Sequence, residues 1–177
     1  MKTKILKLEL IGALFIIFLG SLLHFTFEWS NNFWLVGIFS AVNESTWEHL
    51  KLAVIPALLW LLIEKKILKE KSENFFFAKT IGIYSMPLFI ILIFYSYTAI
   101  FKRNFLILDI LTFIVAVIFG QIISYKLMFL KKIPKIYNQI AIIFLFLLFL
   151  SFVIFTFYPL PNFLFRDPIT FKYGIIK

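Results

Sequence analysis

Long apolar stretches alternate with short polar breaks along the whole chain. A helix needs about 20 predominantly apolar residues to cross a bilayer, and five stretches reach that length. They predict transmembrane helices at roughly residues 5–27, 46–63, 75–100, 105–130 and 137–158. We therefore predict an all-α fold: one integral membrane helical bundle of about five spans, forming a single domain over residues 1–177.

Two segments fall outside these spans. Residues 31–42 contain an apolar run from Phe33 to Phe39 that is too short to cross a bilayer. It predicts a short interfacial helix, with a re-entrant segment as the alternative. The tail, residues 159–177, contains Pro159, Pro161 and Pro168. Because proline does not continue a helix comfortably, we expect this tail to fold over the outer face as a loop.

The composition supports a membrane protein. The chain is 62% hydrophobic and 15% charged, whereas soluble domains are about half apolar and about a quarter charged. It contains no cysteine, which excludes disulfides and thiolate ligands. The formal net charge is +9, but the basic residues cluster at span ends and form no stripe. We therefore expect membrane lipids as partners and no nucleic acid.

The placement of charge also predicts an orientation. Most of the 18 Lys and Arg residues lie on the same side of the predicted spans as the N-terminus. The positive-inside rule then predicts the N-terminus inside and the C-terminus outside, in a bacterial cytoplasmic membrane. Both histidines and several acidic residues fall together near the outer leaflet; the acidic ones are Glu28, Glu44, Glu48, Asp109 and Asp167.

Ionisable residues mark the outer ends of the first two predicted spans. His24 and Glu28 are four residues apart and share one helix face. The stretch from Asn43 to His49 reads Asn-Glu-Ser-Thr-Trp-Glu-His and stands at the start of the second span. Ionisable groups at membrane depth are costly, which makes these residues functional candidates.

These side chains are typical of a zinc site. Zinc binds histidine nitrogen and carboxylate oxygen, and a catalytic zinc keeps one position for water. A further carboxylate can act as general base on that water. We predict His24, His49 and Glu28 as metal ligands, with Glu44, Glu48 and Asp167 as catalytic residues. Glu44 or Glu48 is an alternative ligand, and Asp109 is an alternative accessory residue.

Structural roles compete with this interpretation. Ser45 and Glu48 fit a capping box, in which Glu48 only satisfies backbone N–H groups at a helix start. Asp109 fits a charge that complements a helix dipole, and Asp167 fits a turn residue. The whole set could also be a polar network that holds the bundle together.

The motif at 43–49, with the stretch from His24 to Ser30 before it and the Pro56-containing helix after it, resembles a known family. This is a family of small uncharacterised bacterial multi-pass membrane proteins that carry an Asn-Glu-Ser-x-Trp-Glu-His motif. The resemblance covers most of the chain and implies a fold but no activity. A looser similarity in mechanism links the chain to intramembrane metal hydrolases of the ceramidase and adiponectin-receptor kind.

Three functions fit these observations. The first is a metal-dependent hydrolase or transferase that acts on a lipid-like substrate at the outer leaflet. The second is a non-enzymatic membrane partner or chaperone whose polar layer is structural. The third is a cation or proton transporter, although the inner halves of the later spans carry few ionisable groups for a through-path.

Overall fold

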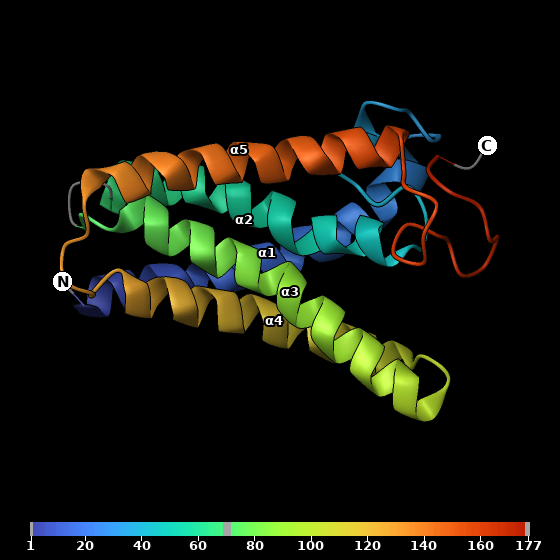
Figure 1. The fold of residues 1–177 in the computed structure, drawn as a ribbon, viewed down its shortest axis with the longest axis horizontal. Helices are drawn as coiled ribbons and strands as arrows, with labels where there is room; N and C mark the ends of the chain where they lie inside the picture. Colours follow the sequence, from blue (N-terminus) through green and yellow to red (C-terminus); the bar gives the residue numbers. More distant parts are fainter. Residues whose placement is uncertain (1, 69–71, 176–177) are drawn as a thin grey trace.

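The computed structural model describes residues 2–68 and 72–175. Within these ranges, five long helices run up and down one bundle (Figure 1): α1 (Lys2–Trp29), α2 (Thr46–Leu68), α3 (Phe75–Phe101), α4 (Leu106–Leu127) and α5 (Lys135–Phe157). The described residues form no strand, and one isolated bridge joins Arg166 to Tyr173. The predicted all-α class is confirmed. The last two residues of the predicted tail lie outside the described residues.

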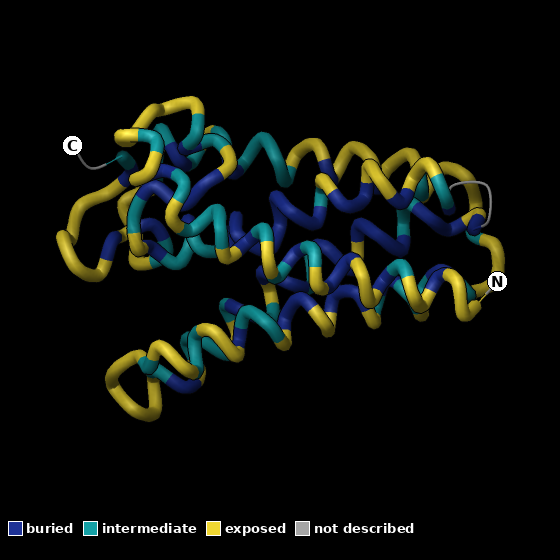
Figure 2. Tube along the Cα trace, turned by 180° about the vertical axis from the view of Figure 1, so that it is seen from behind, coloured by how far each residue is buried: buried dark blue, intermediate teal, exposed yellow. Residues whose placement is uncertain are grey.

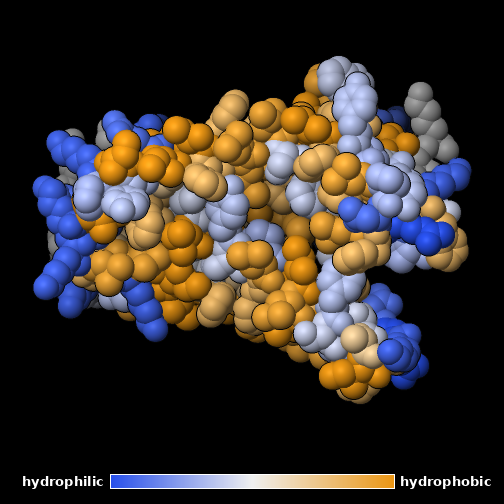
Figure 3. Space-filling view, viewed as in Figure 1, coloured by the Kyte–Doolittle hydropathy of each residue, from blue (hydrophilic) through white to orange (hydrophobic). Residues whose placement is uncertain are grey.

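The length and composition of four described helices suggest a membrane protein. Of the helices described, α1, α3, α4 and α5 are long and apolar enough to cross a membrane. Hydrophobic side chains cover the middle of the molecule, and hydrophilic ones gather at its two ends (Figure 3). Exposed apolar side chains in such a middle band are suited to contact lipid.

Helix α2 differs from the other four. It is not among the described helices that qualify as spans, and it carries Glu48, Lys51 and Glu64. All three of these side chains are buried, since α2 packs against α1, α3 and α5. Buried positions gather where the helices face one another (Figure 2). That α2 crosses the membrane as a fifth span remains a prediction.

Glycines set the close approach between neighbouring helices. A Cβ on Gly20 of α1 would collide with the Leu52 carbonyl of α2, and one on Gly12 would collide with the Trp60 indole. Between α3 and α4, a Cβ on Gly82 would lie 2.6 Å from the carbonyl oxygen of Gly120, and the reverse holds too. Small residues of this kind let helix backbones pack tightly in membranes. The antiparallel register of α1 and α2 follows from these contacts.

The two ends of the bundle contain different segments of the chain (Figure 1). One end, called here the lysine-rich end, contains the N-terminus and the α2–α3 and α4–α5 connections. The other end, called the loop end, contains residues 30–45, the α3–α4 turn and the tail after α5. The hairpin of α3 and α4 diverges from the other helices towards its tip. Among the described residues, the exposed lysines of the lysine-rich end are Lys2, Lys4, Lys7, Lys65, Lys66, Lys126, Lys131, Lys132 and Lys135.

The segment between α1 and α2 folds as a compact loop. It contains one short 3-10 turn, η1 (Val36–Ile38), where a short interfacial helix was expected over residues 31–42. Gly37, Ser40, Ala41 and Val42 are buried, and the Ser40 hydroxyl donates to the Leu23 carbonyl and accepts from the Phe27 N–H. These bonds fix the loop against the end of α1. The position of the loop relative to a membrane remains a prediction.

Candidate metal centre

Three ionisable side chains meet at the loop end of the α1–α2 pair. His24 lies in the last part of α1, Glu44 lies in the loop before α2, and His49 lies in the first turns of α2. One ligand atom from each residue lies within 4.8 Å of the others. Because α1 and α2 are antiparallel and tightly packed, the end of one helix lies beside the start of the other, which brings the histidines together.

The geometry within this cluster, called here the metal centre (His24, Glu44 and His49), suits a small cation. His49 Nε2 lies 3.4 Å from Glu44 Oε2, and the ring centroids of His24 and His49 are 5.2 Å apart. The side chains of His49 and Glu44 are 35% and 45% exposed. The centre is therefore only partly buried, and it can be reached from outside the bundle.

The two imidazoles differ in their hydrogen bonds, and each arrangement suits metal binding. His49 Nδ1 donates to the Ser45 carbonyl at 2.9 Å, which leaves Nε2 as the nitrogen that faces Glu44. A backbone carbonyl on the other ring nitrogen is a common partner of a metal-bound histidine, because it fixes the tautomer and the ring orientation. His24 Nδ1 is buried and has no hydrogen-bond partner in the described part of the chain. A metal ion would satisfy that nitrogen.

The tail after α5 holds the Glu44 loop in place. Asp167 Oδ2 accepts from the Glu44 N–H at 3.0 Å, and the Gly174 carbonyl accepts from Asn43 Nδ2 at 2.7 Å. Asp167 Oδ1 accepts from the backbone N–H groups of Ile169 and Thr170. Asp167 is therefore both the turn residue and a support for the loop that carries Glu44.

The Glu44 and Asp167 carboxyls are held in their ionised forms. The hydrogen bond from His49 lowers the pKa of the Glu44 carboxyl, and it outweighs the partial burial of that group. Burial alone would raise the pKa of Asp167, but the N–H groups of Thr170, Glu44 and Ile169 outweigh burial and lower it. Ionised carboxylates are the form that binds a cation.

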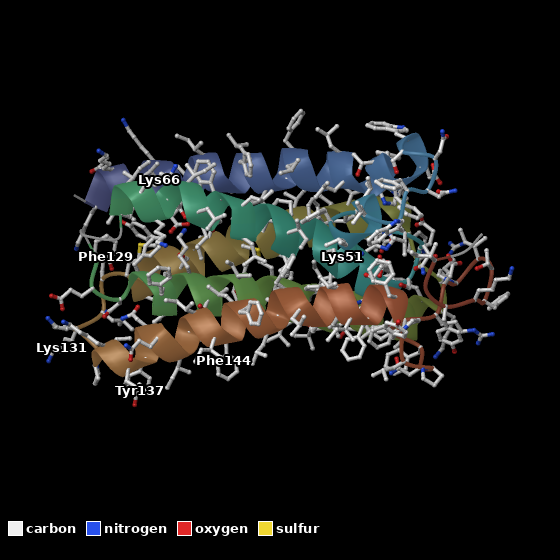
Figure 4. All side chains as sticks on the ribbon, turned by 90° about the horizontal axis from the view of Figure 1, so that it is seen from above. Lys51, Lys66, Phe129, Lys131, Tyr137 and Phe144 are labelled. Atoms are coloured by element: carbon white, nitrogen blue, oxygen red, sulfur yellow. The ribbon has the colours of Figure 1, made fainter. Side chains whose placement is uncertain are left out.

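Glu48 has another set of partners. Its Oε2 lies 2.5 Å from Lys51 Nζ and accepts from the Val42 N–H at 3.0 Å, and its Oε1 accepts from the Thr156 hydroxyl at 3.0 Å. Lys51 Nζ also donates to the Gly37 carbonyl and to Thr156, both at 2.8 Å. Lys51 lies inside the bundle, whereas Lys66 and Lys131 lie at the opposite end (Figure 4).

This pair, called here the α2–α5 ion pair (Glu48 and Lys51), ties α2 to α5 and to the loop with η1. Ser45 also caps α2, because its hydroxyl accepts from the Glu48 N–H at 3.4 Å. The Glu48 carboxylate reaches back to Val42 and not to Ser45, so the capping box is only half formed. The i, i+3 spacing of Glu48 and Lys51 is the sequence signal for this pair, and the sequence interpretation did not use it.

The other predicted site residues are not members of the three-residue metal group. Glu28 is exposed on α1, one turn after His24, and is not a member of the three-residue group. Asp109 lies in the first turn of α4, where it accepts hydrogen bonds from Tyr97 and from Asn104 at the hairpin tip. The structure thus brings together both predicted histidines with Glu44, and it places Glu48 and Asp167 in supporting contacts.

Comparisons with known proteins give a family and no activity. A family model described as a family of unknown function (DUF6512) matches residues 1–175. No curated protein and no solved structure matches the chain. The match agrees with the expected resemblance to an uncharacterised family, while the family motif and the bacterial origin remain predictions.

Proposed function

Since the chain belongs to the DUF6512 family of unknown function, we propose a function from the metal centre itself. We propose that the protein is a membrane-embedded, zinc-dependent hydrolase or transferase that acts on a lipid-like substrate. One observation carries this proposal: ligand atoms of His24, Glu44 and His49 lie within 4.8 Å of one another at the edge of an apolar bundle.

Two imidazole nitrogens and one carboxylate oxygen form a donor set typical of catalytic zinc. Such a site leaves a fourth position for water, and zinc lowers the pKa of that water to about 7. Glu44 replaces Glu28 as the proposed carboxylate ligand, because Glu44 is in contact with His49. Glu28, exposed and one turn from His24 on α1, becomes the proposed general base.

The proposed reaction is hydrolysis of an ester. His24, Glu44 and His49 would hold the zinc ion, which would supply an acidified water for attack on the ester carbonyl carbon, and Glu28 would accept the proton of that water. The bond to the leaving alkoxide then breaks, and Glu28 returns the proton to the leaving alcohol. With an acceptor hydroxyl in place of water, the same steps give a transferase.

The lipid-like substrate is proposed from the location of the centre. His24 lies within α1, one of the described helices that can cross a membrane, and its neighbours Phe25 and Trp29 are exposed. Aromatic side chains of this kind are enriched at the membrane interface. We place the centre at the outer leaflet of a bacterial cytoplasmic membrane, with the N-terminus inside, because the lysine-rich end fits the positive-inside rule.

Hydrolysis of fluorescent ester lipids in proteoliposomes tests this proposal. We expect turnover that a zinc chelator abolishes and added zinc restores. Glu28→Gln is expected to lower kcat by at least about 100-fold, the usual contribution of a general base, while the protein keeps its zinc. Glu73→Gln is the matched control, since Glu73 is an exposed carboxylate paired with Lys132. Turnover that resists the chelator, or that Glu28→Gln leaves intact, would contradict the mechanism.

A non-enzymatic role is the second candidate. The tail contacts the Glu44 loop through Asp167 and Gly174, and a metal ion there could serve only to fix the tail. Under that role, zinc removal would free the tail to proteolysis with no substrate turned over, whereas an enzyme would show both effects.

A further inference from the structure

A second cluster of charged residues lies towards the lysine-rich end of the bundle. Glu9 of α1, Glu64 of α2 and Lys79 of α3 meet there, called here the inner cluster. Lys79 Nζ lies 2.8 Å from Glu9 Oε1 and also forms an ion pair with Glu64 Oε2. The exposed fractions of these residues are 2%, 0% and 2%. The cluster is thus closed to solvent and lipid.

The charges of the inner cluster do not balance. It contains two carboxylates and one ammonium, and its other described contacts are neutral. From α4, the Ser124 hydroxyl donates to Glu9 Oε1 at 2.9 Å and Gln121 Nε2 donates to the Glu9 carbonyl at 3.2 Å. Three lysines at the nearby ends of α2 and α4 are exposed: Lys65, Lys66 and Lys126. Helix α5 adds no charged group to the described contacts of the cluster.

Unpartnered atoms also indicate a missing ligand. Glu9 Oε2 and Glu64 Oε1 are buried without a hydrogen-bond partner among the described residues. Glu64 Oε2 has no hydrogen-bond partner there either and makes only its ion pair with Lys79. Buried polar groups almost always have partners, because leaving one unpaired costs about 1–3 kcal/mol. Several such atoms in one place therefore require an explanation.

We propose that the inner cluster is a proton-binding site, in which Glu9 and Glu64 share one proton beside the Lys79 ammonium. Binding one proton brings the net charge of the cluster to zero. Two carboxylates in one low-dielectric site cannot both ionise cheaply, and they titrate as a pair. A carboxylic O–H also supplies the donor that the unpartnered oxygens lack.

A proton fits this site better than a metal cation does. The Lys79 ammonium contacts both carboxylates, so a metal ion on the same carboxylates would lie close to a positive charge. An ionisable group inside a membrane marks a proton relay or an ion site by default. The inner cluster therefore adds a proton-handling site to the helix pair, α1 and α2, that carries the metal centre at its other end.

Infrared spectroscopy of the purified protein tests the proposal. At neutral pH the wild type is expected to show a carboxylic acid C=O band that shifts in deuterated water. Glu9→Gln and Glu64→Gln are each expected to abolish this band, because one carboxylate and Lys79 then form a neutral pair. Lys79→Met should raise the band area about twofold, since both carboxyls are then protonated. Glu73→Gln, at an exposed ion pair, is the matched control and should leave the band unchanged.

Three results would overturn the proposal. The first is a folded wild type with no carboxylic band at neutral pH. The second is a band that appears only when sodium is withdrawn, which would identify a metal cation as the ligand. The third is a band that persists in both glutamine variants, which would place the proton elsewhere. Glutamine is the neutral isostere of a protonated glutamate, so both variants are expected to fold, and circular dichroism checks this.

Discussion

Helix α2 carries a buried charged cluster at each end, and the two clusters differ in completeness. In the α2–α5 ion pair, one carboxylate meets one ammonium, and each charged atom of Glu48 and Lys51 has its partners. A lysine has three N–H donors, and Lys51 uses them on Glu48, Gly37 and Thr156. In the inner cluster, two carboxylates share one lysine, and two carboxylate oxygens have no partner among the described residues.

This difference indicates which buried clusters only stabilise the fold and which of them bind a ligand. A neutral cluster with every hydrogen bond made needs no ligand, and it serves to fix the helices and the loop around it. A cluster that has an unmatched charge, or buried polar atoms without hydrogen-bond partners, is incomplete until a ligand binds. The metal centre belongs to the incomplete kind, because His24 Nδ1 is buried without a partner in the described chain.

Breaking the α2–α5 ion pair should have the largest effect on the stability of the protein. Lys51→Met leaves the Glu48 carboxylate buried without its cation, and we expect it to lower the free energy of unfolding by about 3–5 kcal/mol. Unfolding in detergent micelles measures this. The double variant Glu48→Gln with Lys51→Met should recover most of the loss. Lys132→Met, at a surface pair with more than half of each side chain exposed, should cost less than about 1 kcal/mol. Equal losses at the two lysines would contradict the account.

Disturbing the packing of α1 against α2 should affect both the metal centre and the inner cluster. Gly20→Ala places a methyl group against the Leu52 carbonyl, and we expect a loss of about 1–3 kcal/mol in stability. Because this contact sets the α1–α2 register, the variant should also bind less zinc and show a weaker carboxylic band. Ser21→Ala, at the exposed neighbouring position, should change stability by less than about 0.5 kcal/mol. A Gly20→Ala protein with both sites intact would show that the register does not depend on this glycine.

Removing a support should weaken the metal centre without removing a ligand. Asp167→Asn loses the charge that accepts the Glu44 N–H, and we expect zinc affinity to fall by about 10- to 100-fold, as for other residues that orient ligands. Competition with a fluorescent zinc chelator measures this affinity. Asn162→Asp changes an amide in the same tail, at a local turn contact, and should leave zinc affinity unchanged. An unchanged affinity in Asp167→Asn would mean that the tail does not position Glu44.

The smallest expected effect is a change in the stability of the protein at acid pH. The hydrogen bond from His49 lowers the pKa of Glu44 below its ordinary value of 4.5. The stability that this contact contributes is therefore present above pH 4.5, and it is lost as the pH falls through the lower, folded-state pKa. Since Glu44 is 45% exposed, we expect less than about 1 kcal/mol. Unfolding of metal-free protein over this range should show less acid sensitivity in Glu44→Gln. Equal acid sensitivity in both proteins would contradict this role of the contact.

Much of the fold was predictable because apolar periodicity and length report directly on helices. Four of the described helices start and end within about three residues of the predicted stretches, as α3 (Phe75–Phe101) shows, whereas α2 runs past its predicted end at residue 63 to Leu68. Hydropathy predicts α2 as an ordinary span, although its buried charged residues, Glu48, Lys51 and Glu64, reflect its central, protein-facing position. Hydropathy averages over faces and cannot tell a helix surrounded by protein from one surrounded by lipid.

The candidate site was predictable only in part. His24 and His49 were expected together because both fall at one depth, and the structure brings them together. The choice among carboxylates was not predictable, because it depends on contacts between distant segments. Glu48 is bound by Lys51 and Thr156, Glu44 is held by Asp167, and Glu28 remains on the exposed face of α1.

The zinc content of the purified protein tests the central claim most directly. We expect wild type and Glu73→Gln, purified in detergent after growth with zinc, to contain about one zinc per chain by mass spectrometry. His24→Ala and His49→Ala should each lose nearly all of it while they remain folded. Wild-type protein without metal, or histidine variants that keep it, would contradict a metal centre at His24, Glu44 and His49.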